Sequence, residues 1–129
     1  MSGLSHAEAN ALLTASVLGG TTYLALLTAT PKRSDTGSTL PEAAYTGYAR
    51  AAVPAAAWAA PASGTIVNDQ AITFAACTGG SATIIAFALC SAATAGAVKW
   101  LGARRPLLIS STDPDPPSVA AGVLVLSLD

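Results

Sequence analysis

The stretch TIIAFALC, residues 83–90, decides the fold, because it is almost continuously apolar and rich in β-branched side chains. It lies within residues 70–98, which carry no charged side chain. A membrane-spanning helix needs about 20 consecutive apolar residues, and threonines and glycines interrupt this segment too often for that. The pattern therefore predicts a strand buried on both faces, and no membrane partner.

Further apolar segments on either side predict more strands. Residues 21–29 (TTYLALLTA) are apolar on both faces and are bounded by glycines and by Pro31. Additional short strands are predicted over residues 47–53, 70–77, 98–103, 107–110 and 122–128, with residues 104–106 as an interruption. Turn residues separate these segments, so we predict a mainly β fold, an antiparallel β-sandwich or small barrel of six to seven short strands.

A short helix is predicted near the start of the chain, within residues 1–20. Ser5 and Glu8 have the spacing of a capping box, and Gly19 and Gly20 end the apolar pattern. A helix of this length is marginally stable alone, so its apolar stripe must dock on the chain's own sheet or on a partner. The stripe consists of Leu12, Leu13, Val17 and Leu18.

Charge is scarce in this chain of 129 residues. Charged residues make up 10% and hydrophobic residues 52%, whereas a typical soluble domain carries about 25% charge. The net charge of −1 argues against a nucleic-acid partner, whose binding needs clustered Lys and Arg, so we predict none. The length predicts a single β domain over residues 1–129. A lone monomer seldom exposes so much apolar surface, so we expect a homo-oligomer, specifically a trimer.

Residues 31–46 form a long polar segment that we expect to be an extended arm. The segment is longer than a turn and contains two prolines. Because we expect no core residue within residues 33–39, their deletion is predicted to leave the fold intact. The aromatic side chains Tyr45 and Tyr48 flank the arm and are candidate interface anchors, while Tyr23 and Trp100 are expected in the core.

These features together predict an intermolecular contact surface. It combines part of the helix stripe, the charged side chains of the arm and the two flanking tyrosines. Its members are Leu12, Leu13, Val17, Lys32, Arg33, Asp35, Glu42, Tyr45 and Tyr48.

Residues that carry catalysis or bind metals are sparse. His6 is the chain's single histidine and lies at the start of the predicted helix, so a triad or a metal cluster has no basis. Asp113 and Asp115 alternate with prolines and are interpreted as part of a stiff linker. Cys77 and Cys90 are expected to be buried, reduced thiols, with a disulfide as the alternative. We predict no enzyme, no cofactor and no metal.

Several short motifs follow one another in a characteristic order. They are YLALLTATP (23–31), YTGYAR (45–50), NDQAITF (68–74), IIAFAL (84–89) and AGVLVLSLD (121–129). This order resembles a family of small virion proteins of tailed bacteriophages, often labelled tail fibre or head proteins. The resemblance implies a structural role, which we expect to be that of a capsid decoration (cement) protein on the head surface. Such a protein is made in the host bacterial cytoplasm and binds the major capsid protein. The alternative is a tail or tail-fibre associated structural protein.

Overall fold

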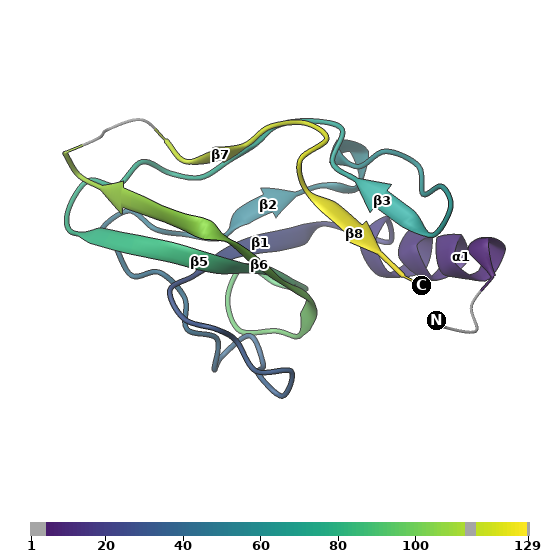
Figure 1. The fold of residues 1–129 in the computed structure, drawn as a ribbon, viewed down its shortest axis with the longest axis horizontal. Helices are drawn as coiled ribbons and strands as arrows, with labels where there is room; N and C mark the ends of the chain where they lie inside the picture. Colours follow the sequence, from purple (N-terminus) through teal and green to yellow (C-terminus); the bar gives the residue numbers. More distant parts are fainter. Residues whose placement is uncertain (1–4, 113–115, 129) are drawn as a thin grey trace. The chain divides into compact units, whose positions relative to one another are not determined.

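The computed structural model describes residues 5–112 and 116–128 and is mainly β, with one α-helix in that part of the chain (Figure 1). The fold class predicted from the sequence is confirmed. In chain order the elements are α1 (His6–Val17), β1 (Thr22–Leu27), β2 (Ala51–Val53), the 3-10 turn η1 (Ala55–Ala57), β3 (Thr65–Val67), β4 (Ile72–Thr73), β5 (Ser81–Cys90), β6 (Val98–Ser110), β7 (Ser118–Val119) and β8 (Val125–Ser127).

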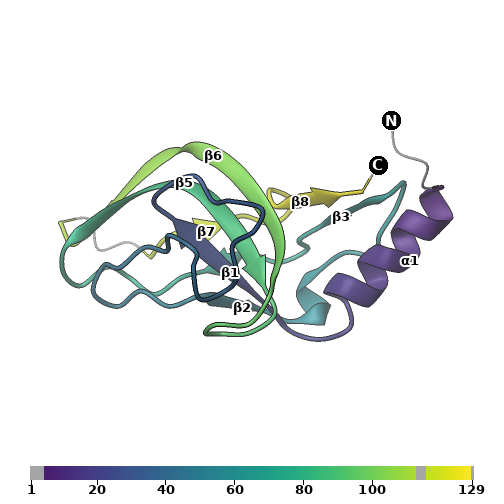
Figure 2. The ribbon, with the colours of Figure 1, turned by 90° about the horizontal axis from the view of Figure 1, so that it is seen from below.

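The largest sheet has four strands in the order β2-β1-β5-β6. β1 pairs antiparallel with β5, from Tyr23 opposite Cys90 to Leu27 opposite Ala86. β5 also pairs antiparallel with β6, which leaves β6 as an edge strand (Figure 2). Both β1 and β5 lie inside the sheet, so each has a hydrogen-bonded neighbour along both of its edges. Two-stranded ladders join β3 to β8 and β4 to β7.

The described residues fall into two compact units whose segments alternate along the chain. The helix unit consists of residues up to Thr22, of Val53–Ile72 and of the segment from Val119 onward. The sheet unit consists of Tyr23–Ala52 and Thr73–Ser118. The two units are described separately below.

In the helix unit, the predicted cap of α1 is confirmed. The Ser5 hydroxyl accepts a hydrogen bond from the Glu8 N–H at 3.1 Å. Asn10 accepts a bond from the Gly64 N–H at 2.9 Å, and this contact ties the helix to the loop before β3.

Asn68 is the main buried polar residue of the helix unit, with 1% of its surface exposed. Its side-chain amide donates to the carbonyls of Gln70 and Ala120 at 2.9 and 3.0 Å. Its side-chain oxygen accepts from the Leu124 N–H at 2.9 Å. Asn68 therefore fastens the end of β3 to the segment that leads into β8.

One buried cluster of the sheet unit is built mostly from small side chains. Its members come from β1, β5 and the arm, and they are Ala25, Leu27, Leu40, Ala86, Ala88 and Cys90. Gly102 lies opposite Phe87 on the neighbouring strand of the same sheet. A Cβ added to Gly102 would lie 2.3 Å from the Phe87 ring, so this glycine leaves room for the aromatic side chain.

The predicted interruption at residues 104–106 is a bulge within one strand. β6 continues from Val98 to Ser110. Ile84 pairs with Leu107 and Ala86 with Ala103, so a single residue of β5 faces three residues of β6. A bulge on an edge strand tolerates the missing N–H of Pro106, which a central strand would not.

Three predicted strands are shorter than expected. β2 begins only at Ala51, because a turn in which the Tyr48 N–H donates to the Tyr45 carbonyl occupies the preceding residues. β4 is two residues long. β8 has three residues, because Gly122, at a φ of 82°, belongs to a turn.

Aromatic burial also differs from the expectation. Tyr23 and Trp100, predicted in the core, are half-buried, whereas Trp58 is buried. Both cysteines are buried and free, so the predicted thiols, and not the alternative disulfide, are observed. No helix among the described residues is long and apolar enough to cross a membrane.

Candidate functional site

The helix supplies less of the predicted contact surface than expected. Leu13 and Val17 have no exposed surface, because they pack with Ala9 inside the chain. Leu12, by contrast, is 44% exposed. The stripe therefore docks on the chain itself, which corrects the assignment of Leu13 and Val17 to an intermolecular contact. Leu12 alone of these three remains reachable by a partner.

The tip of the arm is held by its own polar groups. The Asp35 carboxylate accepts bonds from the Lys32 N–H at 2.7 Å and from the Thr39 hydroxyl at 3.0 Å. These bonds, with the Lys32 backbone contact as the largest, hold the pKa of Asp35 below its usual value. Lys32 and Arg33 are exposed. The arm thus carries exposed cations on a locally ordered loop.

Arg50 holds the arm to the rest of the sheet unit. Its guanidinium pairs with Glu42 at 2.5 Å and donates to the Gly37 carbonyl at 2.7 Å. It also donates to the carbonyls of Ala92 and Ala95 at 2.8 and 2.9 Å, in the turn between β5 and β6. The Arg50 side chain is 3% exposed, and its bonds to Glu42 raise its pKa above the ordinary value.

The arm also touches that turn directly through its backbone. The Gly37 N–H donates to the Gly96 carbonyl at 3.0 Å, and Figure 1 shows the two loops side by side. A Cβ on Gly37 would lie 1.8 Å from the Ala95 carbonyl oxygen. As predicted, residues 33–39 include no residue of the apolar core. Gly37 is nevertheless buried against this turn, so a deletion of residues 33–39 would remove these contacts, and its effect on the fold stays a prediction.

The two tyrosines beside the arm face inward. Their rings make an edge contact with centroids 5.5 Å apart. The Tyr45 hydroxyl donates to the Ala75 carbonyl at 3.2 Å, and Tyr45 is 4% exposed. The Tyr48 hydroxyl donates to Glu42 at 2.6 Å and accepts from the Leu26 N–H at 3.2 Å.

The surroundings of the tyrosines correct part of the predicted surface. Burial and the bond to Glu42 raise the pKa of Tyr48, and burial raises that of Tyr45. Tyr45, Tyr48 and Glu42 therefore form an internal polar cluster with Arg50, and a partner does not meet them as free anchors. Of the arm residues in the predicted surface, Lys32 and Arg33 are exposed and Asp35 is half-exposed.

Sequence reasoning missed Arg50 as the centre of this cluster. The feature that could have identified Arg50 is its position as a single cation in an otherwise apolar, alanine-rich segment. A charge that is buried in such a segment needs an ion-pair or hydrogen-bond partner. A glutamate eight residues earlier completes the pair. The motif YTGYAR thus combines two buried hydroxyls, a turn glycine and a buried cation.

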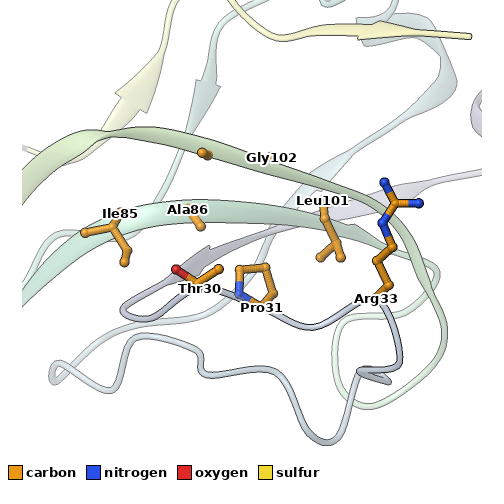
Figure 3. Close-up of a pocket in the computed structure, with 8 residues that line it drawn as sticks. Thr30, Pro31, Arg33, Ile85, Ala86, Leu101 and Gly102 are labelled. Atoms are coloured by element: carbon orange, nitrogen blue, oxygen red, sulfur yellow. The ribbon is translucent and has the colours of Figure 1, made fainter. Parts of the chain in front are cut away.

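A hollow of about 260 Å³ lies between the base of the arm and the sheet (Figure 3). Its lining is mostly apolar, with Pro31 on the arm side and Ile85 and Leu101 on the sheet side. Arg33 lies at its edge. These lining residues include no nucleophile paired with a base and no carboxylate. The hollow could therefore recognise a ligand only by its shape and by the charge of Arg33.

The edge strand β6 carries the largest exposed apolar side chains of the sheet unit. Leu107 is 36% exposed and Leu108 is 66% exposed, next to the exposed guanidinium groups of Arg104 and Arg105. The sequence analysis interpreted this stretch as an interruption and assigned it no contact. The feature that could have indicated a contact is the combination of two leucines and two arginines on an edge strand.

Clusters that would bind a metal are absent from residues 5–112 and 116–128. Asp113 and Asp115, interpreted as a linker, lie outside the described residues. The described residues define a small, mainly β protein whose buried polar groups fasten its loops to one another.

The particular family follows from a sequence comparison. Residues 4–127 match the family described as podophage GP4 fiber I protein gp80. The match covers nearly the whole chain, so the protein belongs to this family of bacteriophage structural proteins, and the predicted resemblance is confirmed. No curated protein matches the chain.

Proposed function

We propose that this protein is a non-enzymatic structural subunit of the virion that forms part of a fibre or its attachment. The observation that carries the proposal is the match of residues 4–127 to a phage fibre protein. The site geometry supports it, since Glu42, Tyr48 and Arg50 bond to one another and to a backbone carbonyl of a neighbouring loop. Such bonds hold loops in place, as a structural role requires.

The architecture suits a mechanical role at the base of a fibre. Long fibre shafts are built from repeated segments, whereas this chain of 129 residues contains no internal repeat. A short β unit with ordered loops can instead join a larger component to the particle. The exposed leucines of β6 supply apolar area for such a contact.

A capsid decoration protein on the head surface, bound to the major capsid protein, is the second candidate. The same observations favour it, namely the small size, the absence of repeats and a charge content of 10%. A decoration protein also needs ordered loops that reach a neighbouring subunit. The two candidates share chemistry and differ in location.

Immunogold electron microscopy of intact virions separates these candidates. Antibodies against the purified protein should label the tail if the protein belongs to a fibre, and the head surface if it is a decoration protein. Virions stained with antibody that was first saturated with free protein are the control. Mass spectrometry first confirms that the virions contain the protein. If such virions bind no antibody, either intact or after the particle has been mildly opened, both surface assignments are overturned.

A further inference from the structure

An exposed patch on the edge strand of the sheet unit has an unusual composition. We define the basic edge patch as Arg104, Arg105, Leu107 and Leu108, all of which are exposed. Edge strands invite unwanted pairing, and charged residues, prolines and bulges on the edge discourage it. The bulge over residues 104–106 contains all three devices. A partner at this patch is therefore expected to contact its side chains and not to add a strand to the sheet.

The helix unit carries an exposed patch of the opposite charge. We define the acidic valine patch as Asp69, Val123 and Val125. Val123 is 65% and Val125 is 51% exposed, while the alternating residue Leu124 is buried. The hydrogen bonds between Asn68 and the segment around Leu124 bring the exposed Asp69 beside these valines.

The cations of the chain are confined to the sheet unit, which also contains carboxylates, among them Asp35 and Glu42. All six Lys and Arg residues of the chain lie in the sheet unit. The charged side chains of the helix unit are acidic, and those in the described residues are Glu8 and Asp69. Opposite charges on the two patches favour association of the basic edge patch of one copy with the acidic valine patch of another.

We propose that the basic edge patch of one copy binds the acidic valine patch of a second copy, head to tail. Leu108, which is the more exposed leucine of β6, and the two valines leave water together, and the two patches carry charges of opposite sign. The alternative, a two-fold contact of β6 with β6, would bring four guanidinium groups together, and like charges disfavour that arrangement. A head-to-tail contact forms a closed ring when its rotation closes and an open chain when it does not.

The decisive experiment mixes two variants, each with one damaged patch. Leu107→Ser/Leu108→Ser removes the apolar part of the basic edge patch, and Val123→Ser/Val125→Ser removes that of the acidic valine patch. Sedimentation velocity of the full chain should show concentration-dependent association for the wild type and monomers for each variant. An equimolar mixture should form dimers, because one intact pair of patches remains. Leu12→Ser, at an exposed leucine outside both patches, is the matched control and should associate like the wild type.

Charge reversal provides a second and independent measurement. Arg104→Glu/Arg105→Glu and Asp69→Lys should each weaken association about tenfold or more, and added salt should weaken wild-type association. These substitutions are at exposed positions, and circular dichroism checks that each variant is folded.

Three outcomes would overturn the proposal. The first is a wild type that stays monomeric at high concentration. The second is a valine variant that still associates, which would indicate a β6–β6 contact. The third is a mixture of the two serine variants that stays monomeric. The proposal concerns self-association alone, and the virion labelling experiment decides the proposed function separately, so each can fail without the other.

Discussion

The arm, residues 31–46, and the edge strand β6 lie in the same unit but distribute their side chains in opposite ways. The arm is polar in sequence, yet Leu40 and Gly37 are buried and Glu42 is paired. β6 is more apolar, yet Leu108 is 66% exposed. The polarity of a segment therefore does not determine whether its side chains are exposed. Exposure depends on which groups find partners within the chain, and this principle is directly testable.

The largest expected effect comes from removing the charge that holds the arm. Arg50→Met removes the cation paired with the Glu42 carboxylate, which keeps only the Tyr48 hydroxyl as a donor, and leaves the Gly37 carbonyl without its side-chain donor. Loss of one member of a buried ion pair costs about 3–5 kcal/mol, so the free energy of unfolding should fall by that amount. Urea denaturation followed by fluorescence measures the change. A loss below about 1 kcal/mol would show that solvent replaces the Arg50 contacts and that the arm is not fastened by them.

The second effect concerns the close backbone approach of the arm. Gly37→Ala places a Cβ 1.8 Å from the Ala95 carbonyl oxygen, so the arm must separate from the turn between β5 and β6. We expect a loss of about 2 kcal/mol, within the range for overpacked sites. Gly20→Ala is the matched control, since nothing lies within 4 Å of its added Cβ. Equal stability of the two variants would contradict the close approach.

The comparison also explains how much of the fold the sequence predicts. The capped helix and the long apolar strands are predictable because local patterns specify them: the Ser5–Glu8 spacing, and the runs that became β1 and β5. The bulge in β6 was not predictable, because residues 104–106 interrupt the apolar pattern of the strand. Only the pairing with β5 on both sides of these residues shows that the strand continues through them. Long-range pairing turns an apparent interruption into one strand.

The candidate site was less predictable than the fold, for a related reason. Lys32 and Arg33 are exposed as predicted, but Tyr45 bonds to the distant Ala75 carbonyl and Glu42 pairs with Arg50. Charge and aromaticity identify groups that need partners. These two properties do not reveal whether the partner belongs to the same chain or to another molecule. Here Arg50 of the same chain is the partner of Glu42.

A third and smaller effect is expected from acid titration of the arm tip. The Lys32 N–H bond, with Thr39, holds the folded pKa of Asp35 below its value of about 3.9 in unfolded chains. A group with a lowered folded pKa contributes stability above its unfolded pKa, and that contribution is lost as pH falls through the folded pKa. The free energy of unfolding of the wild type should therefore fall more steeply below about pH 4 than that of Asp35→Asn. Thr39→Val should be intermediate, and parallel profiles for all three proteins would contradict the Asp35 contacts.

The smallest effect is expected from the edge strand, and it tests the comparison most directly. Leu108→Ala should change the free energy of unfolding by less than about 0.5 kcal/mol, because a side chain that is mostly in water loses little burial when it is truncated. Leu40→Ala is the matched substitution in the polar arm. Leu40 is 9% exposed in the core of the sheet unit, so its truncation should cost about 2–4 kcal/mol. Both variants are measured at a concentration low enough to keep the chain monomeric. If the Leu108 variant were the less stable of the two, β6 would contribute its leucines to the fold, and the edge strand would no longer be free to meet a second copy.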